Sequence, residues 1–137
     1  SEIRAVSGEL CIPFVSIEEW LCSRYDIEPA DIGTMLGSNP GYQNIKAPTA
    51  FDHRYLWDDI PTGLVPIAQI AQALNVETPI INKLIDQGER ILGRDFREEG
   101  RTMEKLGLTA RHVREELTSI IGDTEDLTED LMERVGV

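Results

Sequence analysis

Residues 46–66 concentrate side chains that can bind anions or transfer protons within a short part of the chain. The groups concerned are His53, Arg54, Tyr55, Asp58 and Asp59. An imidazole titrates near neutral pH, and a guanidinium can hold a carboxylate through two parallel hydrogen bonds. An apolar pattern typical of a helix follows directly, which places these groups at the entrance to a helix. The combination is typical of an enzyme that handles a carboxylate substrate, whereas a purely structural segment has little use for it.

Three blocks of sequence in this region carry a family resemblance. The run Asp-His-Arg-Tyr-Leu-x-Asp-Asp-Ile-Pro-x-Gly-Leu-Val-Pro, at residues 52–66, resembles the C-terminal helical domain of the octopine/nopaline (opine) dehydrogenase family. The resemblance continues in the same order at residues 76–82 and 93–108. It implies an all-α fold, a helical bundle resembling the C-terminal domain of opine dehydrogenases and thus 6-phosphogluconate dehydrogenase C-terminal-like.

The length of 137 residues predicts a single helical domain over residues 1–137. The resemblance is strongest over residues 46–108. Residues 1–45 are compatible with it but carry no sharp motif, and residues 109–137 are interpreted as a C-terminal extension.

The resemblance also implies a reaction and roles for particular residues. Members of the family join the amino group of an amino acid to an α-keto acid, and NADH or NADPH reduces the resulting imine. At the position of Asp59 they carry a catalytic aspartate that pairs with a histidine from an earlier helix, and at the position of Arg54 an arginine that binds a substrate carboxylate. His53 and Tyr55 belong to the same motif and are expected to line the substrate pocket.

Each of these residues also has a structural interpretation. Asp59 precedes a helix with proline at its second position, so its side chain could serve as a helix N-cap. Arg54 could form a salt bridge with one of the many carboxylates, and His53 could be an ordinary loop histidine. Tyr55 could be a core anchor, and Asp58 is interpreted as a solvated neighbour or a cap.

Composition excludes several other classes of function. The chain has 25 acidic against 13 basic residues and a net charge of −12, so nucleic acid and anionic membranes are poor partners. Its apolar runs are too short to span a membrane. The two cysteines, Cys11 and Cys22, lack metal-site spacing, so no metal is expected; they are interpreted as free thiols of a cytoplasmic protein.

The sequence lacks the features of a dinucleotide site. It contains no GxGxxG turn and no strand–turn–helix unit, and it lacks the upstream histidine of the family pair. The chain is therefore interpreted as a C-terminal domain truncated at its N-terminal side, without its Rossmann-type dinucleotide-binding domain. The parent enzyme would use NAD or NADP, bound mainly by that missing domain. No cofactor is expected in this chain, which is predicted to be inactive alone.

Two rival functions remain compatible with the sequence. The first is a stand-alone helical module that binds an amino acid or keto acid through the Arg54 pocket without catalysis. The second is an assembly domain whose helix over residues 79–92 forms a homodimer surface.

The elements that must position these residues are predicted to be helices. Periodicity and capping signals predict them at residues 2–10, 16–24, 29–36, 63–75, 79–92, 101–106 and 109–121. Ser16 and Glu19 form a capping box, and Thr78 is expected to cap the helix that begins at Pro79. Residues 42–57 are predicted to be an ordered loop. The acidic residues 124–137 are predicted to form a weak or frayed helix.

Buried faces and charge pairs follow from the same pattern. The helix over residues 79–92 is expected to bury Ile80, Ile81, Leu84, Ile85, Ile91 and Leu92. The helix over residues 16–24 is expected to present Ile17, Trp20, Leu21 and Tyr25 on one face. Arg94, Arg97, Arg101 and Lys105 alternate with carboxylates and predict an ion-pair network.

Overall fold

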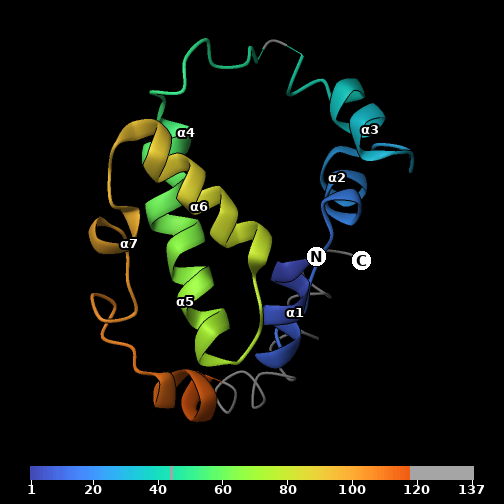
Figure 1. Cartoon of the computed structure of the whole chain (residues 1–137). Coiled ribbons are helices and arrows are strands. Elements are labelled where there is room, and N and C mark those ends of the chain that lie inside the picture. The colour runs from blue at the N-terminus through green and yellow to red at the C-terminus, as the bar shows by residue number, and fades with distance from the viewer. Residues whose placement is uncertain (44, 118–137) are drawn as a thin grey trace. The chain divides into compact units, whose positions relative to one another are not determined.

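The chain is helical throughout the part that the structure describes. A computed structural model describes residues 1–43 and 45–117, and it contains no strand within those ranges. The elements are α1 (Glu2–Glu9), α2 (Ile17–Tyr25), α3 (Ile32–Ser38), α4 (Arg54–Trp57), the π-helical turn η1 (Ile60–Leu64), α5 (Val65–Ala73), α6 (Pro79–Leu92), α7 (Phe96–Glu99) and the π-helical turn η2 (His112–Leu117) (Figure 1). The predicted all-α fold is confirmed. No helix among these residues is long and apolar enough to span a membrane.

The chain divides into two compact units. The larger combines Ser1–Pro13 with the chain from Ala50 onward, and the smaller is Phe14–Thr49. The sequence-based prediction of one helical domain over residues 1–137 stays a prediction. The residues of the candidate site all belong to the larger unit.

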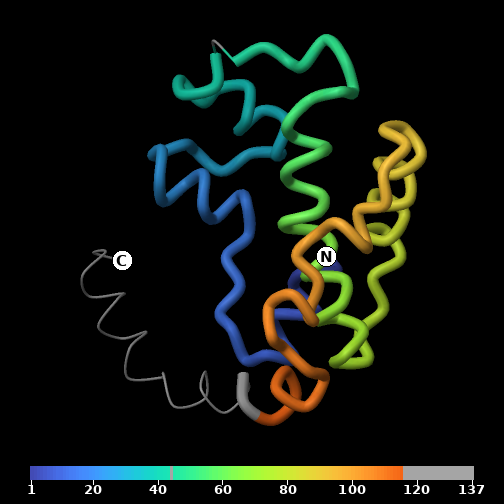
Figure 2. The backbone as a smooth tube through the Cα atoms, turned by 90° about the vertical axis from the view of Figure 1, so that its left-hand side faces the viewer, coloured from blue at the N-terminus to red at the C-terminus, as the bar shows by residue number. Residues whose placement is uncertain are grey.

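The centre of the larger unit is the pair α5 and α6. The two helices run in opposite directions and are joined by a short connection at residues 74–78 (Figures 1 and 2). One core cluster at the end of α5 gathers side chains from α1, α5 and η2. Its buried members are Val6, Leu10, Ala71, Ala73 and Val113.

A second core cluster joins η1, α5, α6 and α7. Its buried members are Ile60, Val65, Ile81, Ile85 and Phe96. Gly88 makes this packing possible, because a Cβ atom there would lie 2.5 Å from Ile60 Cδ1 and 3.2 Å from Phe96 Cε2. The fully buried ring of Phe96 thus packs against α6 at a position where only glycine leaves enough room.

The π-helical turn η1 lies where two prolines, Pro61 and Pro66, lack the backbone N–H that a regular helix would use. The Val65 amide donates to the carbonyl of Ile60, five residues earlier, and neither Pro61 nor Pro66 has an N–H to donate. The turn is braced from downstream, because the Arg101 amide donates to the Pro61 carbonyl at 2.9 Å. Gly100 packs so closely there that a Cβ atom would lie 2.6 Å from the Pro61 oxygen.

The start of α6 is capped from a distant part of the chain. The side chain of Thr78 makes no capping hydrogen bond, so the expected cap is wrong. The Glu2 carboxylate instead accepts from the backbone amides of Ile80 and Ile81, at 2.7 and 2.9 Å. The predicted bounds of this helix, 79–92, are confirmed.

The smaller unit contains α2 and α3. The predicted capping box is present: the Ser16 hydroxyl accepts from the Glu19 amide at 3.1 Å, and the Glu19 carboxylate accepts from the Ser16 amide at 2.7 Å. Helix α3 begins at Ile32 with Asp31 as its cap, later than the expected start at Pro29. Of the predicted face of α2, only Leu21 is buried, and Ile17, Trp20 and Tyr25 are exposed.

Three further expectations differ from the structure. Residues 54–57 of the predicted loop form the short helix α4, and residues 101–106 contain no helix, because the chain forms turns at residues 103–107 instead. Half of the expected buried face of α6 is exposed, namely Ile80, Leu84 and Ile91. The hydroxyl of Thr109 caps the last described element by accepting from the His112 amide at 3.2 Å. The prediction for residues 124–137 lies outside the described residues.

Candidate functional site

His53 and Tyr55 form the start of α4. The Nδ1 atom of His53 accepts from the Tyr55 backbone amide at 3.3 Å, so the imidazole acts as the N-cap of this four-residue helix. The two rings meet edge to face with centroids 4.4 Å apart. Tyr55 is exposed, which removes the interpretation of Tyr55 as a core anchor. Tyr55 is therefore available at the surface next to Arg54, and His53 is half-buried.

Arg54 forms the expected kind of ion pair, and it does so with Asp58. The Nη2 atom lies 3.5 Å from Asp58 Oδ2, one helical turn further along. The Arg54 side chain is 64% exposed. An exposed pair of this kind contributes little to stability, so its guanidinium can exchange Asp58 for an incoming carboxylate at small cost.

The helix-cap interpretation of Asp59 is not supported by the structure. Its side chain makes no capping hydrogen bond, and its backbone is already helical with φ −69° and ψ −33°. A cap would accept from the second or third amide of the helix. Pro61 has no amide, and the Thr62 amide donates instead to the Asp58 carbonyl at 3.1 Å. The exposed carboxylate of Asp59 is thus left out of the local hydrogen bonds that begin the helix.

The structure brings the five predicted residues together along α4 and the start of η1. Two hydrogen bonds brace this segment: the Thr62 hydroxyl donates to the Asp58 carbonyl at 2.8 Å, and the Arg101 amide donates to the Pro61 carbonyl at 2.9 Å. The site is an open surface on these residues, with its positive and negative groups exposed.

A separate groove lies between α5 and α6. It has a volume of about 710 Å³. Apolar side chains from both helices line it, together with the polar side chains of Gln69, Gln72, Asn82 and Arg97. None of the five predicted site residues lines it. The sequence analysis did not single out Gln69 or Asn82. Asn82 ends the resembling block at residues 76–82, and Gln69 is one of two glutamines in the otherwise apolar helix α5.

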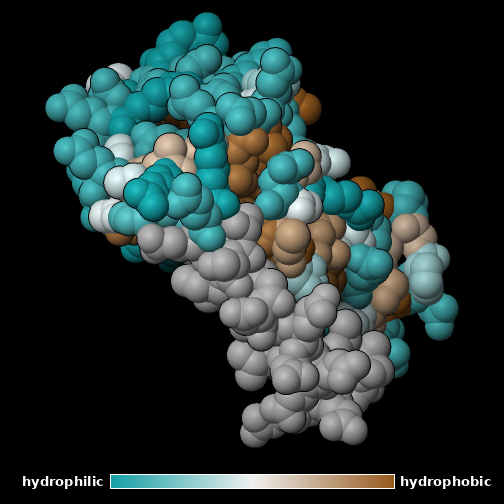
Figure 3. Space-filling model, turned by 90° about the horizontal axis from the view of Figure 1, so that it is seen from below, coloured by the Kyte–Doolittle hydropathy of each residue, from teal (hydrophilic) through white to brown (hydrophobic). Residues whose placement is uncertain are grey.

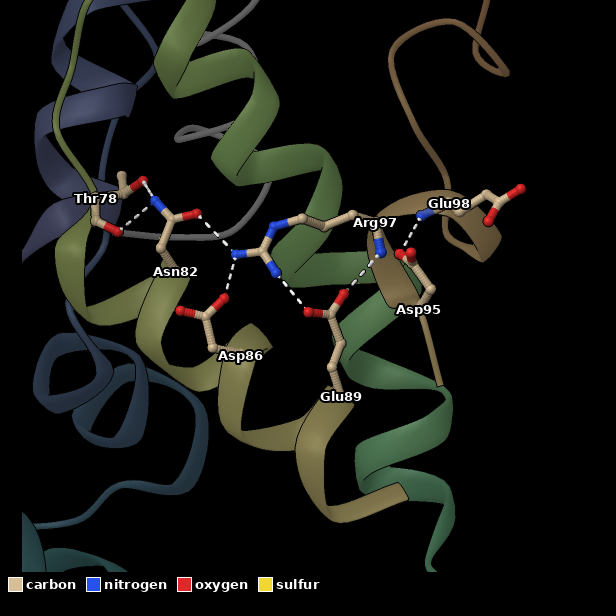
Figure 4. Close-up of polar contacts among 7 residues, drawn as sticks. All are labelled: Thr78, Asn82, Asp86, Glu89, Asp95, Arg97 and Glu98. Carbon is tan, nitrogen blue, oxygen red and sulfur yellow. Dashed lines mark hydrogen bonds and ion pairs between the residues drawn. The ribbon is translucent and has the colours of Figure 1, made fainter. Parts of the chain in front are cut away.

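Arg97 organises the polar side of this groove (Figure 4). Its Nη1 atom donates to Glu89 at 2.6 Å, and its Nη2 atom lies 2.7 Å from Asp86 and donates to Asn82 at 3.4 Å. Asn82 in turn donates to the Thr78 carbonyl at 2.9 Å. Two carboxylates neutralise the guanidinium, so this groove is a poor site for an anion.

The predicted ion-pair network is present only in part: Arg94 and Arg97 form ion pairs within the described residues, whereas Arg101 and Lys105 do not. Arg97 pairs with carboxylates of α6, whereas Arg94 donates through Nε to Glu99 at 2.8 Å. Lys105 makes no ion pair within the described residues; its Nζ donates to the backbone carbonyl of Glu99 at 3.0 Å. Cys11 and Cys22 are free thiols, and the described residues contain no cluster of side chains able to hold a metal ion.

Comparison with known proteins gives one consistent result. Residues 1–92 match the family described as NAD/NADP octopine/nopaline dehydrogenase, alpha-helical domain. An opine dehydrogenase from Arthrobacter sp. (strain 1C) is 42% identical over 105 residues, covering 77% of this chain and 29% of that protein.

Two further relatives match a shorter part of the chain. Protein ocs from Agrobacterium tumefaciens (strain Ach5) is 31% identical over 68 residues, covering 50% of this chain and 19% of the relative. Vitopine synthase from Allorhizobium ampelinum is 32% identical over 68 residues, with the same coverage of 50% and 19%. The chain thus spans less than a third of the length of these curated relatives.

Proposed function

Because this chain belongs to the NAD/NADP octopine/nopaline dehydrogenase family, whose α-helical domain it matches, we propose that it is the substrate-handling part of an opine dehydrogenase. The reaction is the reductive condensation of an amino acid with an α-keto acid. The observation that carries the proposal is the Asp59 carboxylate, which is exposed and takes no part in capping the helix that follows it.

Arg54 binds the carboxylate of one substrate. Its guanidinium presents two parallel donors that match a carboxylate, and its present partner Asp58 is held only by an exposed ion pair. His53 and Tyr55 line the same surface and limit where the rest of the substrate can lie. These contacts orient the substrate without changing its chemistry.

Asp59 orients a catalytic histidine supplied by another part of the enzyme and stabilises its protonated form. A carboxylate hydrogen-bonded to an imidazole fixes the tautomer of the ring and favours the imidazolium. The histidine can then give a proton to the carbonyl oxygen as it leaves, or hold the amino group in its reactive state. The exposure of Asp59 supports this role, since the carboxylate can be reached by a second element.

The described residues do not fit NAD or NADP. They contain no strand from which a dinucleotide-binding turn could start, and the groove arginine Arg97 is already paired with two carboxylates. When bound, the nicotinamide supplies hydride, and we assign its binding to a Rossmann-type domain outside this chain. The isolated chain is accordingly proposed to be inactive. Homodimerisation and a cytoplasmic location stay predictions from the sequence.

Steady-state kinetics on a full-length enzyme containing this sequence tests the proposal. Asp59→Asn keeps the size of the side chain and removes its charge, so kcat is expected to fall about 100-fold or more, while KM for both substrates changes little. Asp58→Asn is the matched control and is expected to leave kcat within about threefold of the unchanged enzyme, because it only breaks an exposed ion pair. Near-normal turnover of Asp59→Asn, with an unchanged melting temperature, would exclude the catalytic role.

A further inference from the structure

His53 occupies the N-cap position of α4, the helix that begins with Arg54. Its backbone is extended, with φ −140° and ψ 148°, and its Nδ1 atom accepts from the Tyr55 amide at 3.3 Å. Side chains with an oxygen close to the backbone usually fill this position, because that oxygen can accept from the first amides of the helix. An imidazole nitrogen does the same here. Nδ1 can accept only if it carries no proton, so the proton of the neutral ring must lie on Nε2.

Helix α4 is short enough to depend on this bond. The Trp57 and Asp58 amides donate to carbonyls four residues earlier, at 3.3 and 2.8 Å. Leu56 packs against the second core cluster, whereas Tyr55 and Trp57 are 49% and 44% exposed. A single helical turn is unstable by itself, because fixing its backbone costs more than one or two hydrogen bonds offset. The cap therefore contributes a large part of what keeps α4 formed.

The exposed rings of α4 do not by themselves mark a binding surface. Apolar side chains reach the surface elsewhere on the molecule as well, as the brown patches in Figure 3 show. The His53 and Tyr55 rings do contact each other edge to face, with centroids 4.4 Å apart. This contact is a second way in which His53 could influence α4, and it can be separated from the cap by substitution.

Arg54 is the site residue that loses most when α4 loosens. It follows the cap directly, and its ion pair with Asp58 needs the one-turn spacing that the helix provides. Asp59 is held separately, because the Thr62 hydroxyl and the Arg101 amide brace η1 through hydrogen bonds of their own. Loss of the cap therefore frees the guanidinium and leaves the Asp59 carboxylate in place.

We propose that His53 is a positioning residue for substrate binding, whose neutral ring caps α4 through Nδ1 and so holds Arg54 in place for the substrate carboxylate. The inference rests on the proposed function, in which Arg54 binds that carboxylate, and it gives His53 a role that needs no contact between the imidazole and the substrate. The contribution to affinity comes from ordering the guanidinium before the substrate arrives.

Nitrogen-15 NMR of the imidazole in the full chain tests the cap without any measurement of activity. The chemical shifts of the two ring nitrogens show which one carries the proton, and His53→Asn identifies the signals of this ring. At about pH 8, where imidazoles are neutral, we expect the proton of His53 on Nε2. A proton on Nδ1 would overturn the inference, since that nitrogen could no longer accept from the Tyr55 amide.

Steady-state kinetics on a full-length enzyme tests the consequence for substrate. His53→Gln and His53→Phe are expected to raise KM for one carboxylate substrate about fivefold, the size of change that loss of an N-cap produces, with kcat within about twofold. His53→Asn is expected to recover most of this loss. Asparagine and glutamine carry the same carboxamide, but only asparagine is short enough to be a good N-cap. Hydrogen exchange of the Asp58 amide should follow the same order, about fivefold faster with glutamine than with asparagine.

The same variants decide between the cap and other roles of His53. Direct contact with the substrate predicts that glutamine replaces histidine better than asparagine, and a role through the Tyr55 ring predicts that phenylalanine does; either result overturns the inference. If Arg54→Lys raises KM while His53→Gln and His53→Phe do not, the positioning role is wrong and the proposed function stands. An unchanged KM in Arg54→Lys overturns the proposed role of Arg54 and this inference with it.

Discussion

The carboxylate of Glu2 lies 2.7 Å from the backbone nitrogen of Ile80, 78 positions further along the chain, and completes the first turn of α6. Its second oxygen accepts from the next amide, that of Ile81. The first amides of a helix have no partner within it, and a negative charge at that end also interacts favourably with the helix dipole. Glu2 thus joins α1 to α6 through a cap that local sequence cannot supply.

Removing this cap should destabilise the larger unit. Glu2→Ala leaves two amides without their acceptor, and we expect a loss of about 1–2 kcal/mol in the free energy of unfolding. Glu9→Ala, at an exposed glutamate of the same helix, should change it by less than about 0.5 kcal/mol. Urea titrations of both variants provide the measurement; equal midpoints would show that the Glu2 contact does not stabilise α6.

Gly100→Ala should be more disruptive than any other glycine-to-alanine change near η1. The new methyl group would lie 2.6 Å from two backbone oxygens, those of Phe96 and Pro61, which cannot move aside as side chains do. We expect a loss of about 2–3 kcal/mol, within the range for overpacking. The control is Gly63→Ala, where a Cβ atom meets nothing within 4 Å. Thermal unfolding that ranks these two variants equally would contradict the close approach of Gly100 to the turn.

Arg97 should matter more to stability than Arg94, although their exposure is similar. Arg97 holds three partners on α6, whereas Arg94 pairs with Glu99 at the surface. Arg97→Ala leaves Asp86 and Glu89 without a cation, with an expected cost of about 1–2 kcal/mol. Arg94→Ala should cost no more than about 0.5 kcal/mol. Chemical denaturation in the same buffer compares them directly; a larger loss for Arg94→Ala would refute the role assigned to the network.

Helix α3 should lose its cap in acid. The Thr34 hydroxyl donates to Asp31 at 2.6 Å and the Thr34 amide at 3.1 Å, and these bonds hold the pKa of Asp31 below its usual value. Because the folded-state pKa lies below the unfolded value of about 3.9, the stabilisation is complete above that value and disappears as the pH falls through the folded pKa. Carbon-13 NMR titration should show the lowered pKa.

Thr34→Val is the matched variant for this titration. It removes the hydroxyl donor while retaining the backbone amide, so the pKa of Asp31 should rise toward its usual value. A pKa that does not move on this substitution would show that the hydroxyl is not the main cause of the shift.

Arg54→Lys should act on substrate binding in a full-length enzyme. Lysine keeps the charge but loses the two parallel donors, so KM for one carboxylate substrate should rise by about tenfold with a smaller change in kcat. Arg101→Lys serves as the control for a general effect of losing a guanidinium. An unchanged KM in Arg54→Lys would mean that the ion pair with Asp58 is the whole role of this residue.

The sequence predicts long periodic elements well and their exposed faces poorly. The bounds of α6 follow from its apolar period and the Thr78-Pro79 start, yet the period cannot tell which apolar residues meet the core. Ile80 and Ile81 are adjacent and chemically identical, but only Ile81 faces Val65 and Ile85. Periodicity does not predict short elements. Helix α4 has only four residues, too few to show a helical period, and it depends on the His53 side chain for its cap.

For the candidate site, the sequence identifies the residues, and the structure shows which hydrogen bonds and ion pairs they form. The motif at residues 52–66 identifies Arg54 and Asp59, but local pattern alone favours Asp59 as a helix cap. That interpretation fails because Pro61 removes the amide that a cap would bind, and Thr62 uses its amide elsewhere. The Arg97 groove depends on contacts between α6 and α7, which no spacing within a single helix predicts.

The segment that follows α6 completes the core cluster formed by η1, α5 and α6. The family model matches residues 1–92, yet the ring of Phe96 packs against Ile60 and Gly88, and the Arg101 amide donates to the Pro61 carbonyl. A chain ending at Leu92 would keep every residue of the candidate site and lose the ring that supports it from behind. The residues of the candidate site thus lie within the family match, whereas part of the packing and hydrogen bonding behind them comes from residues 93–101.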